Sequence, residues 1–435
     1  MKEGNCMEPG GWISPGAFSN HIHDITRQDI ENLLKLADEE DAWSQRVKDE
    51  VEYYDKHPGE GGPIFIQQTR ITNTAGTTIR FPYGDIITFR SKRHLFRGEN
   101  QDFGTSIPSL NRKLNKLSKV DAELYRAIAN MRINQFSRFI WKINLIPYWD
   151  ATLSDINYKA LAQHYGFETH LLDLTNDFKT ALFFATCTYV PETDSYRPLT
   201  KKDINTSNRA QYGMIFHSPD WVIDFLNGSS FLTWSCKHEK DKRNSPYLID
   251  SGDLDGIAFQ IGFQPFMRCH HQSGYVFPMR NEVILQQNEK FEKLRFKQSE
   301  DLSQYVYEMM DGGKKVYPNE GINDALDVLR LIQSAVVFSE EDVKEVYEEV
   351  DKSVFSSFDL FSEALLKTNV AGRPIQIVPN EVEYPMDKGL LERINDRYDN
   401  VEEILKPIGG KFYTLPECRE WRRQRCIQIY GREID

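Results

Sequence analysis

The stretch from Leu161 to Thr186 reads LAQHYGFETHLLDLTNDFKTALFFAT and decides the fold of this chain. Its first part repeats apolar residues at helical spacing up to Tyr165, and Gly166 follows where helices commonly end in a left-handed residue. The next residues, ETHLLDL, suit a short strand whose side chains alternate between two sides. A second helical pattern then begins at Phe178. The segment therefore predicts a helix–strand–helix unit, with Asp155 capping the first helix and one of residues 175–177 capping the second.

Polar side chains gather at the ends of these predicted elements. His164 and Tyr165 lie at the end of the first helix, where the helix dipole favours a cationic histidine. Asp173 and Thr175 come just before the second helix, whose free N–H groups can receive a phosphate. Thr169 shares one side of the strand with Asp173. One interpretation is a site for a phosphate-bearing ligand, and the other is a buried acid and a satisfied histidine that tie down a loop.

The whole chain sets limits on the function. It has 435 residues with 40% hydrophobic content, enough for two or three folded domains. A net charge of −12 argues against a nucleic-acid binder that acts by broad counterion release. The six cysteines include no CxxC pair, no signal peptide opens the sequence, and no apolar run is long enough to span a membrane. We therefore expect a cytoplasmic protein, with its oligomeric state left open.

The pattern along the chain predicts three regions. Residues 1–85 form an N-terminal extension with a helix and strand pairs, residues 86–300 an α+β domain, and residues 301–435 a mainly helical region. The α+β domain is expected to contain a mixed or antiparallel sheet with flanking helices. Three short strands are predicted at YGMIFHS, GIAFQIGF and EVILQQ, and a polar surface loop at residues 191–210.

Three motifs give the chain a resemblance to a known family. Phe96-Arg97-Gly98 is the tripeptide from which FRG domains take their name, and the run from Gln163 to Thr175 resembles their central motif of Gln-His-Tyr-Gly followed by Thr-Arg-Leu-Leu-Asp-Trp-Thr. Arg268, with Gln272, Gly274 and Phe277, is similar to a third motif. The chain departs from the pattern at His170, in place of the usual arginine, and at Leu174, in place of the usual tryptophan. The resemblance implies a bacterial or phage origin and an association with defence or toxin-like systems.

Arg97 and Gly98 suggest a nucleotide ligand. An arginine on a strand offers a planar fork for phosphate, and a following glycine lets a ligand approach the backbone. This arrangement is similar to the first motif of Arg-Ser-Glu ADP-ribosyltransferases, which implies an ADP-ribosyltransferase-like architecture that binds NAD. Arg268, Gln272, Tyr165, Thr169, Asp173 and Thr175 are then expected to contact the cofactor. The alternative for Arg97 is a structural salt bridge, with Asp173 as the candidate partner.

A catalytic acid completes this hypothesis. Glu282 is chemically the best candidate, ahead of Gln272 and Gln286, since a carboxylate can bond a ribose hydroxyl and stabilise an oxocarbenium-like transition state. His164 is the second predicted catalytic residue. The alternative for Glu282 is a polar strand end without a catalytic role.

Three functions compete. The first is an ADP-ribosyltransferase or NAD glycohydrolase with a protein or nucleic acid as acceptor. The second is a non-enzymatic module that recognises a phage protein or a nucleotide. The third, a nuclease that uses His164 and Asp173, lacks further acids at suitable spacing. The histidines at 21, 23, 270 and 271 do not have the spacing of a metal site, so no metal is expected.

Overall fold

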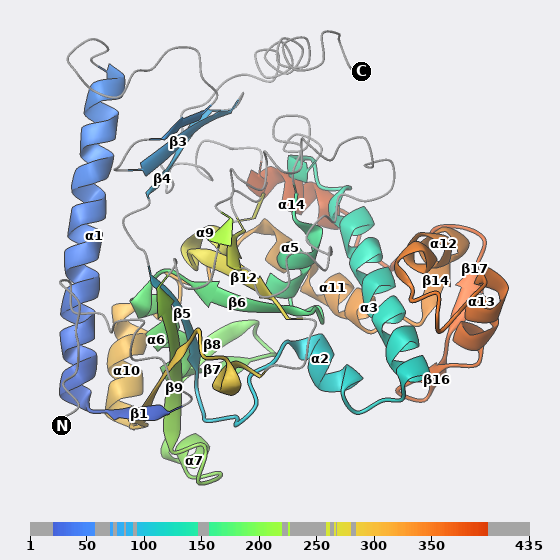
Figure 1. Ribbon diagram of the computed structural model, residues 1–435. Coiled ribbons are helices and arrows are strands. Elements are labelled where there is room, and N and C mark those ends of the chain that lie inside the picture. Colours follow the sequence, from blue (N-terminus) through green and yellow to red (C-terminus); the bar gives the residue numbers. More distant parts are fainter. Residues whose placement is uncertain are drawn as a thin grey trace.

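The computed structural model describes residues 21–56, 70–72, 76–81, 84–89, 94–146, 156–219, 225–226, 258–261, 265–266, 268–279 and 284–398. Within these ranges, no helix has both the length and the apolar character needed to cross a membrane. The described chain has an α+β fold, in which helices flank a central mixed sheet (Figure 1). The predicted fold class is confirmed to that extent.

The central sheet has the strand order β1-β13-β9-β5-β6-β12-β11-β10. Its six inner strands pair in antiparallel fashion, and β1 and β10 pair in parallel at the two edges. The strands are β1 (Ile22–Ile25), β5 (His94–Glu99), β6 (Leu171–Thr175), β9 (Tyr212–Pro219), β10 (Phe225–Leu226), β11 (Ala258–Gln260), β12 (Gly274–Pro278) and β13 (Glu292–Lys297). YGMIFHS is therefore confirmed as a strand, β9.

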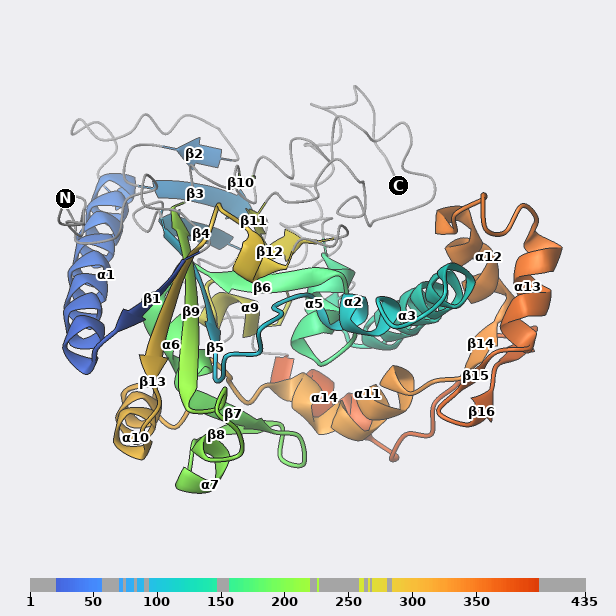
Figure 2. The same ribbon diagram turned by 60° about the horizontal axis from the view of Figure 1, so that its bottom comes forward.

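The central sheet has a narrow junction between β5 and β6, which we call the seam. Strands β5 and β6 are joined at a single residue pair, Phe96 with Thr175, whereas β5 pairs with β9 over six residues. In Figures 1 and 2 the half-sheet that contains β5 and β9 runs across the direction of β6 and β12. The two half-sheets therefore diverge on either side of one backbone pair.

Helices cover one face of both half-sheets. Over the β5 half, the apolar side chains of α1, α6 and α10 form one core with Phe96, and over the β6 half α3, α5, α9, α11 and α14 form another. The opposite face has its own cluster around Leu172 and Leu174. The helices are α1 (Arg27–Lys56), α2 (Ser109–Leu114), α3 (Lys119–Ile140), α5 (Tyr158–His164), α6 (Phe178–Thr186), α7 (Lys201–Ile204), α9 (Arg268–His271), α10 (Glu300–Met309), α11 (Leu326–Gln333), α12 (Glu340–Glu349), α13 (Phe358–Leu366) and α14 (Leu390–Tyr398). Two 3-10 turns, η5 (Leu285–Gln287) and η6 (Gly321–Ala325), complete them.

Smaller sheets lie outside the central one. The predicted N-terminal strand pairs are β2 (Arg70–Thr72), β3 (Gly76–Phe81) and β4 (Gly84–Phe89), which form an antiparallel sheet. The remaining strands are β7 (Cys187–Val190), β8 (Ser195–Pro198), β14 (Val337–Ser339), β15 (Asn369–Val370), β16 (Arg373–Pro374) and β17 (Gln376–Val378).

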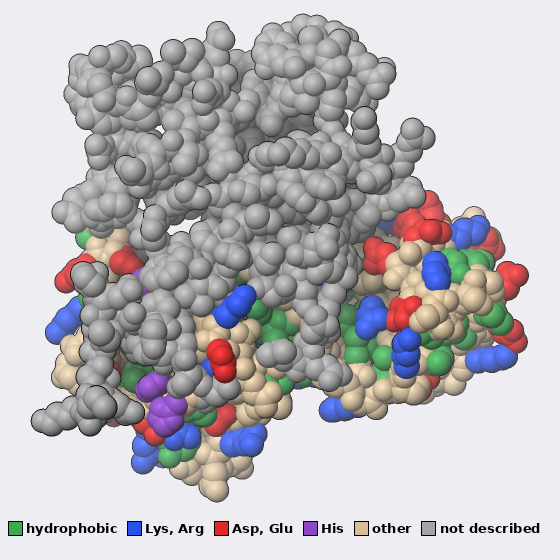
Figure 3. All heavy atoms as spheres, viewed as in Figure 1, with side chains coloured by type: hydrophobic (Ala, Val, Ile, Leu, Met, Phe, Trp, Pro, Cys, Tyr) green, Lys and Arg blue, Asp and Glu red, His purple; other side chains and the backbone are tan. Residues whose placement is uncertain are grey.

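The C-terminal region packs directly on the central domain. One core joins Leu161 of α5 to Ile322 and Leu329, and a second joins Ile128 of α3 to Phe361 of α13. Because these cores continue across residue 300, the division into three regions stays a prediction. On the face seen in Figure 3, acidic and basic side chains alternate over the lobe that contains α12 and α13.

Three local predictions were wrong. Residues 284–287 of EVILQQ form the end of a loop and the turn η5, because the backbone N–H of Leu285 donates to the carbonyl of Ser106. Residues 191–210 contain β8 and α7 as well as loop, since Thr200 and Asp203 form a capping box. The C-terminal region also contains the unpredicted strands β14–β17, because residues 337–339 pair in parallel with residues 376–378.

A chain of buried ionisable side chains crosses three strands of the sheet. His94 and His217 share a hydrogen bond of 2.8 Å, and His217 contacts Glu292 at 3.1 Å. Burial lowers the pKa of each histidine to about 3 and raises the pKa of Glu292 to about 8. All three groups are therefore neutral near pH 7, and the contact between His217 and Glu292 is a neutral hydrogen bond.

These shifts predict how stability depends on pH. Between pH 4.5 and about 8 the folded state holds a proton on Glu292 that the unfolded state has lost, so stability falls as pH rises. Between pH 6.5 and about 3 the histidines take up protons only when unfolded, so stability falls as pH drops. Above pH 6.5, the free energy of unfolding of the wild type should fall by up to about 1.4 kcal/mol per pH unit. We expect Glu292→Gln to abolish this fall, which urea unfolding at several pH values would measure.

The matched control is Glu363→Gln on α13. That carboxylate is exposed and paired with Lys367, which lowers its pKa and leaves it ionised throughout this pH range. Parallel stability curves for the wild type and Glu292→Gln would show that the buried carboxyl does not titrate in this range.

Candidate functional site

Helix α5 and the turn after it follow the sequence closely. The side chain of Asn157 caps α5 by accepting from the N–H of Ala160 at 3.0 Å, so the predicted cap, Asp155, which lies outside the described residues, is replaced two residues later. Gly166 has a φ of +86°, as its position in the sequence predicted. His164 and Tyr165 therefore lie at the end of the helix, pointing into the protein interior.

Helix α6 uses its own side chains at its N-terminus. Asp177 caps it by accepting from the N–H of Thr180 at 2.9 Å. The hydroxyl of Thr175 accepts from the N–H of Asp177 at 3.0 Å and donates to the carbonyl of Gln272 at 2.7 Å. These contacts use the Thr175 hydroxyl and the N–H groups of Asp177 and Thr180, which the sequence suggested for a phosphate. Thr175 instead connects β6 to the residue after α9 and caps the turn before α6.

Gln163 joins two predicted site residues and was missed by the sequence reading. Its amide oxygen accepts from the hydroxyl of Thr169, and its amide nitrogen donates to Oδ1 of Asp173. The carboxylate of Asp173 can only accept, so it fixes the amide nitrogen of Gln163 towards itself and the amide oxygen towards Thr169. The only signal in the sequence was that Gln163 begins the Gln-His-Tyr-Gly motif.

His164 is a neutral buried imidazole with an unused nitrogen. Its side chain is 8% exposed, and its Nε2 atom has no hydrogen-bond partner among the described residues. Desolvation lowers the pKa of His164 and outweighs the nearby Asp173, which favours the charged form. The predicted cationic histidine is therefore wrong, and the imidazole is available to bind a hydroxyl or an N–H group.

Arg268 is held by contacts within the protein. Its guanidinium lies between the rings of Tyr165, at 4.5 Å, and Tyr317, at 3.8 Å. Its Nη1 atom donates to the carbonyl of His164 at 3.0 Å, and Nη2 forms an ion pair with Asp194. Burial alone would lower the pKa of Arg268, but the surrounding tyrosines and acids raise it above its ordinary value, so the guanidinium stays charged.

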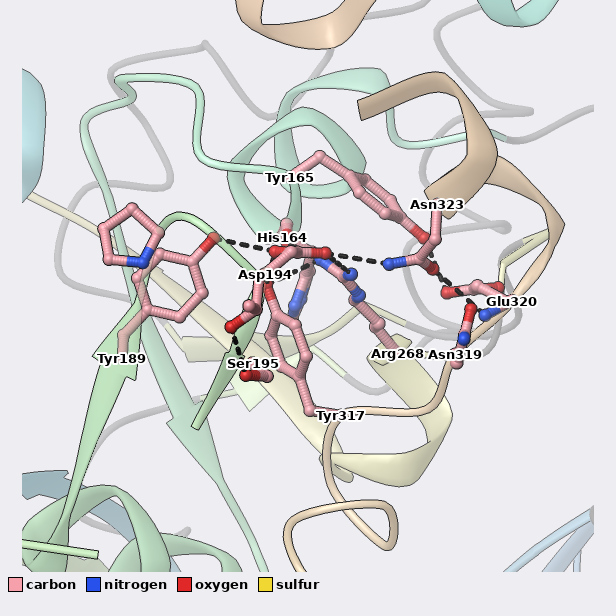
Figure 4. A network of polar contacts seen from close by, with 12 residues as sticks. His164, Tyr165, Tyr189, Asp194, Ser195, Arg268, Tyr317, Asn319, Glu320 and Asn323 are labelled. Atoms are coloured by element: carbon pink, nitrogen blue, oxygen red, sulfur yellow. Dashed lines mark hydrogen bonds and ion pairs between the residues drawn. The ribbon is translucent and has the colours of Figure 1, made fainter. Parts of the chain in front are cut away.

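Asp194 balances this buried charge with a saturated carboxylate (Figure 4). Its Oδ1 atom accepts from the hydroxyls of Tyr189, at 2.7 Å, and Tyr317, at 2.8 Å. Its Oδ2 atom accepts from Arg268 and from the amide of Asn323, the latter at 2.8 Å. We call Arg268, Asp194, Tyr165, Tyr317, Glu320 and Asn323 the anchor cluster. No local pattern indicated Asp194, because its partners come from distant segments.

The tripeptide Phe96-Arg97-Gly98 has a structural basis. Phe96 packs under α6, and a Cβ atom at Gly98 would lie 1.7 Å from the carbonyl oxygen of Ala181, so only glycine lets the helix approach. Arg97 donates to the carbonyl of Asp173 at 3.0 Å and forms an ion pair with Glu99 at 2.9 Å. The alternative of a salt bridge with Asp173 is therefore wrong in its partner: the ion pair of Arg97 is with Glu99, and only the main chain of Asp173 is bonded, across the seam.

The structure brings most of the predicted residues together and separates one. Strand alternation places Arg97 with Leu95, on the face opposite Phe96 and the covering helices. The other residues lie on the helical face, where we call Gln163, His164, Thr169, Asp173 and Gln272 the polar cluster. It adjoins the anchor cluster at His164. Glu282 lies outside the described residues, and the described parts contain no group of acids, cysteines or histidines arranged for a metal.

Comparison with known proteins agrees with this geometry. Residues 92–194 match the FRG domain, so this chain is an FRG-domain protein. The match covers the tripeptide and the run from Gln163 to Thr175, and it ends at Asp194, so the motif at Arg268 lies beyond it. No curated protein and no solved structure matches the chain significantly.

Asp194→Asn should destabilise the protein strongly, because it leaves the Arg268 charge buried without its counter-charge. Breaking such a buried pair costs about 3–5 kcal/mol, which urea unfolding would resolve. Asp203→Asn is the matched control, since its partner Arg197 is 44% exposed and such a pair contributes at most about 1 kcal/mol. Equal losses in the two variants would mean that the anchor cluster is no stronger than a surface pair.

Gly98→Ala tests the packing explanation of the tripeptide. The added methyl group meets the backbone of α6, so the helix must move, and overpacking of this kind costs about 1–3 kcal/mol or more. The measurement is the urea unfolding midpoint of the variant. An unchanged midpoint would mean that α6 does not rest on β5 at this residue.

Proposed function

We propose that the polar cluster binds an NAD-type nucleotide and that the protein is an ADP-ribosyltransferase-like module of a bacterial defence or toxin-like system. The observation that carries the proposal is the pair of unused polar atoms in the cluster. Among the described residues, His164 Nε2 has no hydrogen-bond partner and the Oδ2 atom of the half-buried Asp173 accepts no hydrogen bond, although Gln163 holds its Oδ1 atom. Buried polar groups are normally satisfied, and a ribose diol supplies suitable donors for both.

Arg97 supplies the second part of this proposal. Its guanidinium is 21% exposed and is hydrogen-bonded to the main chain of Asp173, the residue whose side chain belongs to the polar cluster. Arg97 and the Asp173 side chain lie on opposite faces of the sheet, so a ligand that meets Asp173 with a ribose would reach Arg97 with a phosphate only past the seam, where the two half-sheets diverge. A guanidinium fork suits phosphate, and its Nη2 atom has no hydrogen bond to the described residues.

Catalysis in this proposal depends on Glu282. The neutral His164 is suited to orient a ribose or nicotinamide group, which leaves the stabilisation of positive charge at the sugar to a carboxylate. Glu282→Gln should abolish NAD hydrolysis or transfer and leave NAD binding within about twofold. Preserved turnover in that variant would remove Glu282 from the mechanism.

A second candidate is a non-enzymatic recognition module. It is favoured by the anchor cluster, in which both Nη atoms of Arg268 are bonded by Asp194, Tyr317 and the carbonyl of His164, so that the charge is already paired. Within the described residues, the polar cluster itself therefore offers a pyrophosphate no unpaired cation. A protein or nucleic-acid surface rich in hydroxyl and amide donors would suit the same atoms.

Calorimetric titration with NAD and ADP-ribose decides between the two. We expect Asp173→Asn to weaken binding roughly ten- to a hundredfold, because a hydrogen bond to a charged group contributes about 1.5–3 kcal/mol. Glu168→Gln is the matched control, since it removes a carboxylate of the same segment that bonds Tyr125 outside the cluster. If the wild-type protein binds neither nucleotide, the recognition module becomes the working function.

A further inference from the structure

Arg268 carries a connection between two parts of the chain. It is 1% exposed and sits between a ring from the end of α5 and a ring from the segment after α10. Its Nη1 atom donates both to the carbonyl of His164, at 3.0 Å, and to the hydroxyl of Tyr317, at 2.7 Å. Movement of Tyr317 is therefore transmitted to the main chain of His164 through one rigid, planar group.

The carbonyl of His164 depends on this contact. The last carbonyls of a helix lack partners within the helix, and α5 ends at His164. The N–H groups that turn back here bond Ala162 and Gln163, and the guanidinium serves the carbonyl of His164. Arg268 thus holds the main chain from which the His164 imidazole projects.

The segment 314–323 is itself firmly held. Asp311, Gly312 and Gly313 all have positive φ and turn the chain back after α10, and Val316 is buried in the core with α6 and α10. Glu320 then accepts from the hydroxyl of Tyr165 at 2.6 Å, and Asn323 donates to Asp194. Three side chains of this segment therefore converge on the anchor cluster (Figure 4).

We propose that Tyr317 is a positioning residue for His164, and that the segment 314–323 couples the C-terminal region to the polar cluster. The hydroxyl of Tyr317 accepts from Arg268 and donates to Asp194, so it fixes the guanidinium relative to its counter-ion. The proposal rests on the proposed function only for its effect on binding, because the coupling to His164 exists without a ligand. A change in the C-terminal region, such as the docking of a partner there, alters the site through this route.

The test compares two tyrosine hydroxyls on the same carboxylate oxygen. Tyr317→Phe removes the one that also contacts Arg268, and it keeps the ring beside Tyr189 and Tyr196. Tyr189→Phe removes the other hydroxyl on Oδ1 of Asp194. Within the described residues, that hydroxyl has no hydrogen bond to Arg268. Both variants take one hydrogen bond from Asp194, so an effect that acts only through the carboxylate is equal in the two.

The measurement is the NMR spectrum of protein labelled at histidine, with the His164 signal assigned by its loss in His164→Gln. We expect Tyr317→Phe to shift or broaden that signal and to weaken ADP-ribose binding at least about fivefold. Tyr189→Phe should leave the signal in place and the affinity within about twofold. Equal shifts in both variants, or none in either, would overturn the coupling. Absence of ADP-ribose binding by the wild type would refute the proposed function, while the NMR comparison would still decide the coupling.

Discussion

The ion pair between Arg268 and Asp194 is the constraint on which the rest of the structure depends. A buried guanidinium is tolerated where its charge is matched, and here the partners of Arg268 come from three other parts of the chain. The requirement brings together the end of α5, the loop before β8, helix α9 and the segment before η6. It also explains why the C-terminal region packs on the FRG domain: without Tyr317 and Asn323 the pair would be incompletely enclosed.

The Gln-His-Tyr-Gly motif contributes residues to both the anchor cluster and the polar cluster. Within Gln-His-Tyr-Gly, Tyr165 turns towards the anchor and Gln163 towards Asp173, while His164 lies between them with a free nitrogen. The glycine allows the chain to leave the helix at once. One short segment thus supplies both the support and the polar groups of the site. At His170, where the chain departs from the family pattern, the main-chain carbonyl accepts from the N–H of Met279.

Local patterns predicted much of the fold and less of the site. Apolar spacing located α5, α6 and β9, and Gly166 marked the end of α5, because these features depend on neighbouring residues. Asp194 and Tyr317 lie in loops and Asn323 in the turn η6, and only tertiary contacts make them part of one network. The same limit applies to Arg97, which was placed on the right strand, although only the sheet's register shows that it faces away from His164.

The seam between β5 and β6 is the part of the central sheet with the least main-chain pairing. A sheet whose halves share one backbone pair resists bending there far less than a continuous ladder, and local openings in proteins begin where such support is weakest. Arg97 crosses the seam, because its side chain on β5 donates a hydrogen bond to the main chain of β6. A change in the angle between the two half-sheets would change the distance between the guanidinium of Arg97 and the carboxylate of Asp173. The anchor cluster thus holds the half-sheet that contains β6, and the bond from Arg97 connects the half-sheet that contains β5 to it.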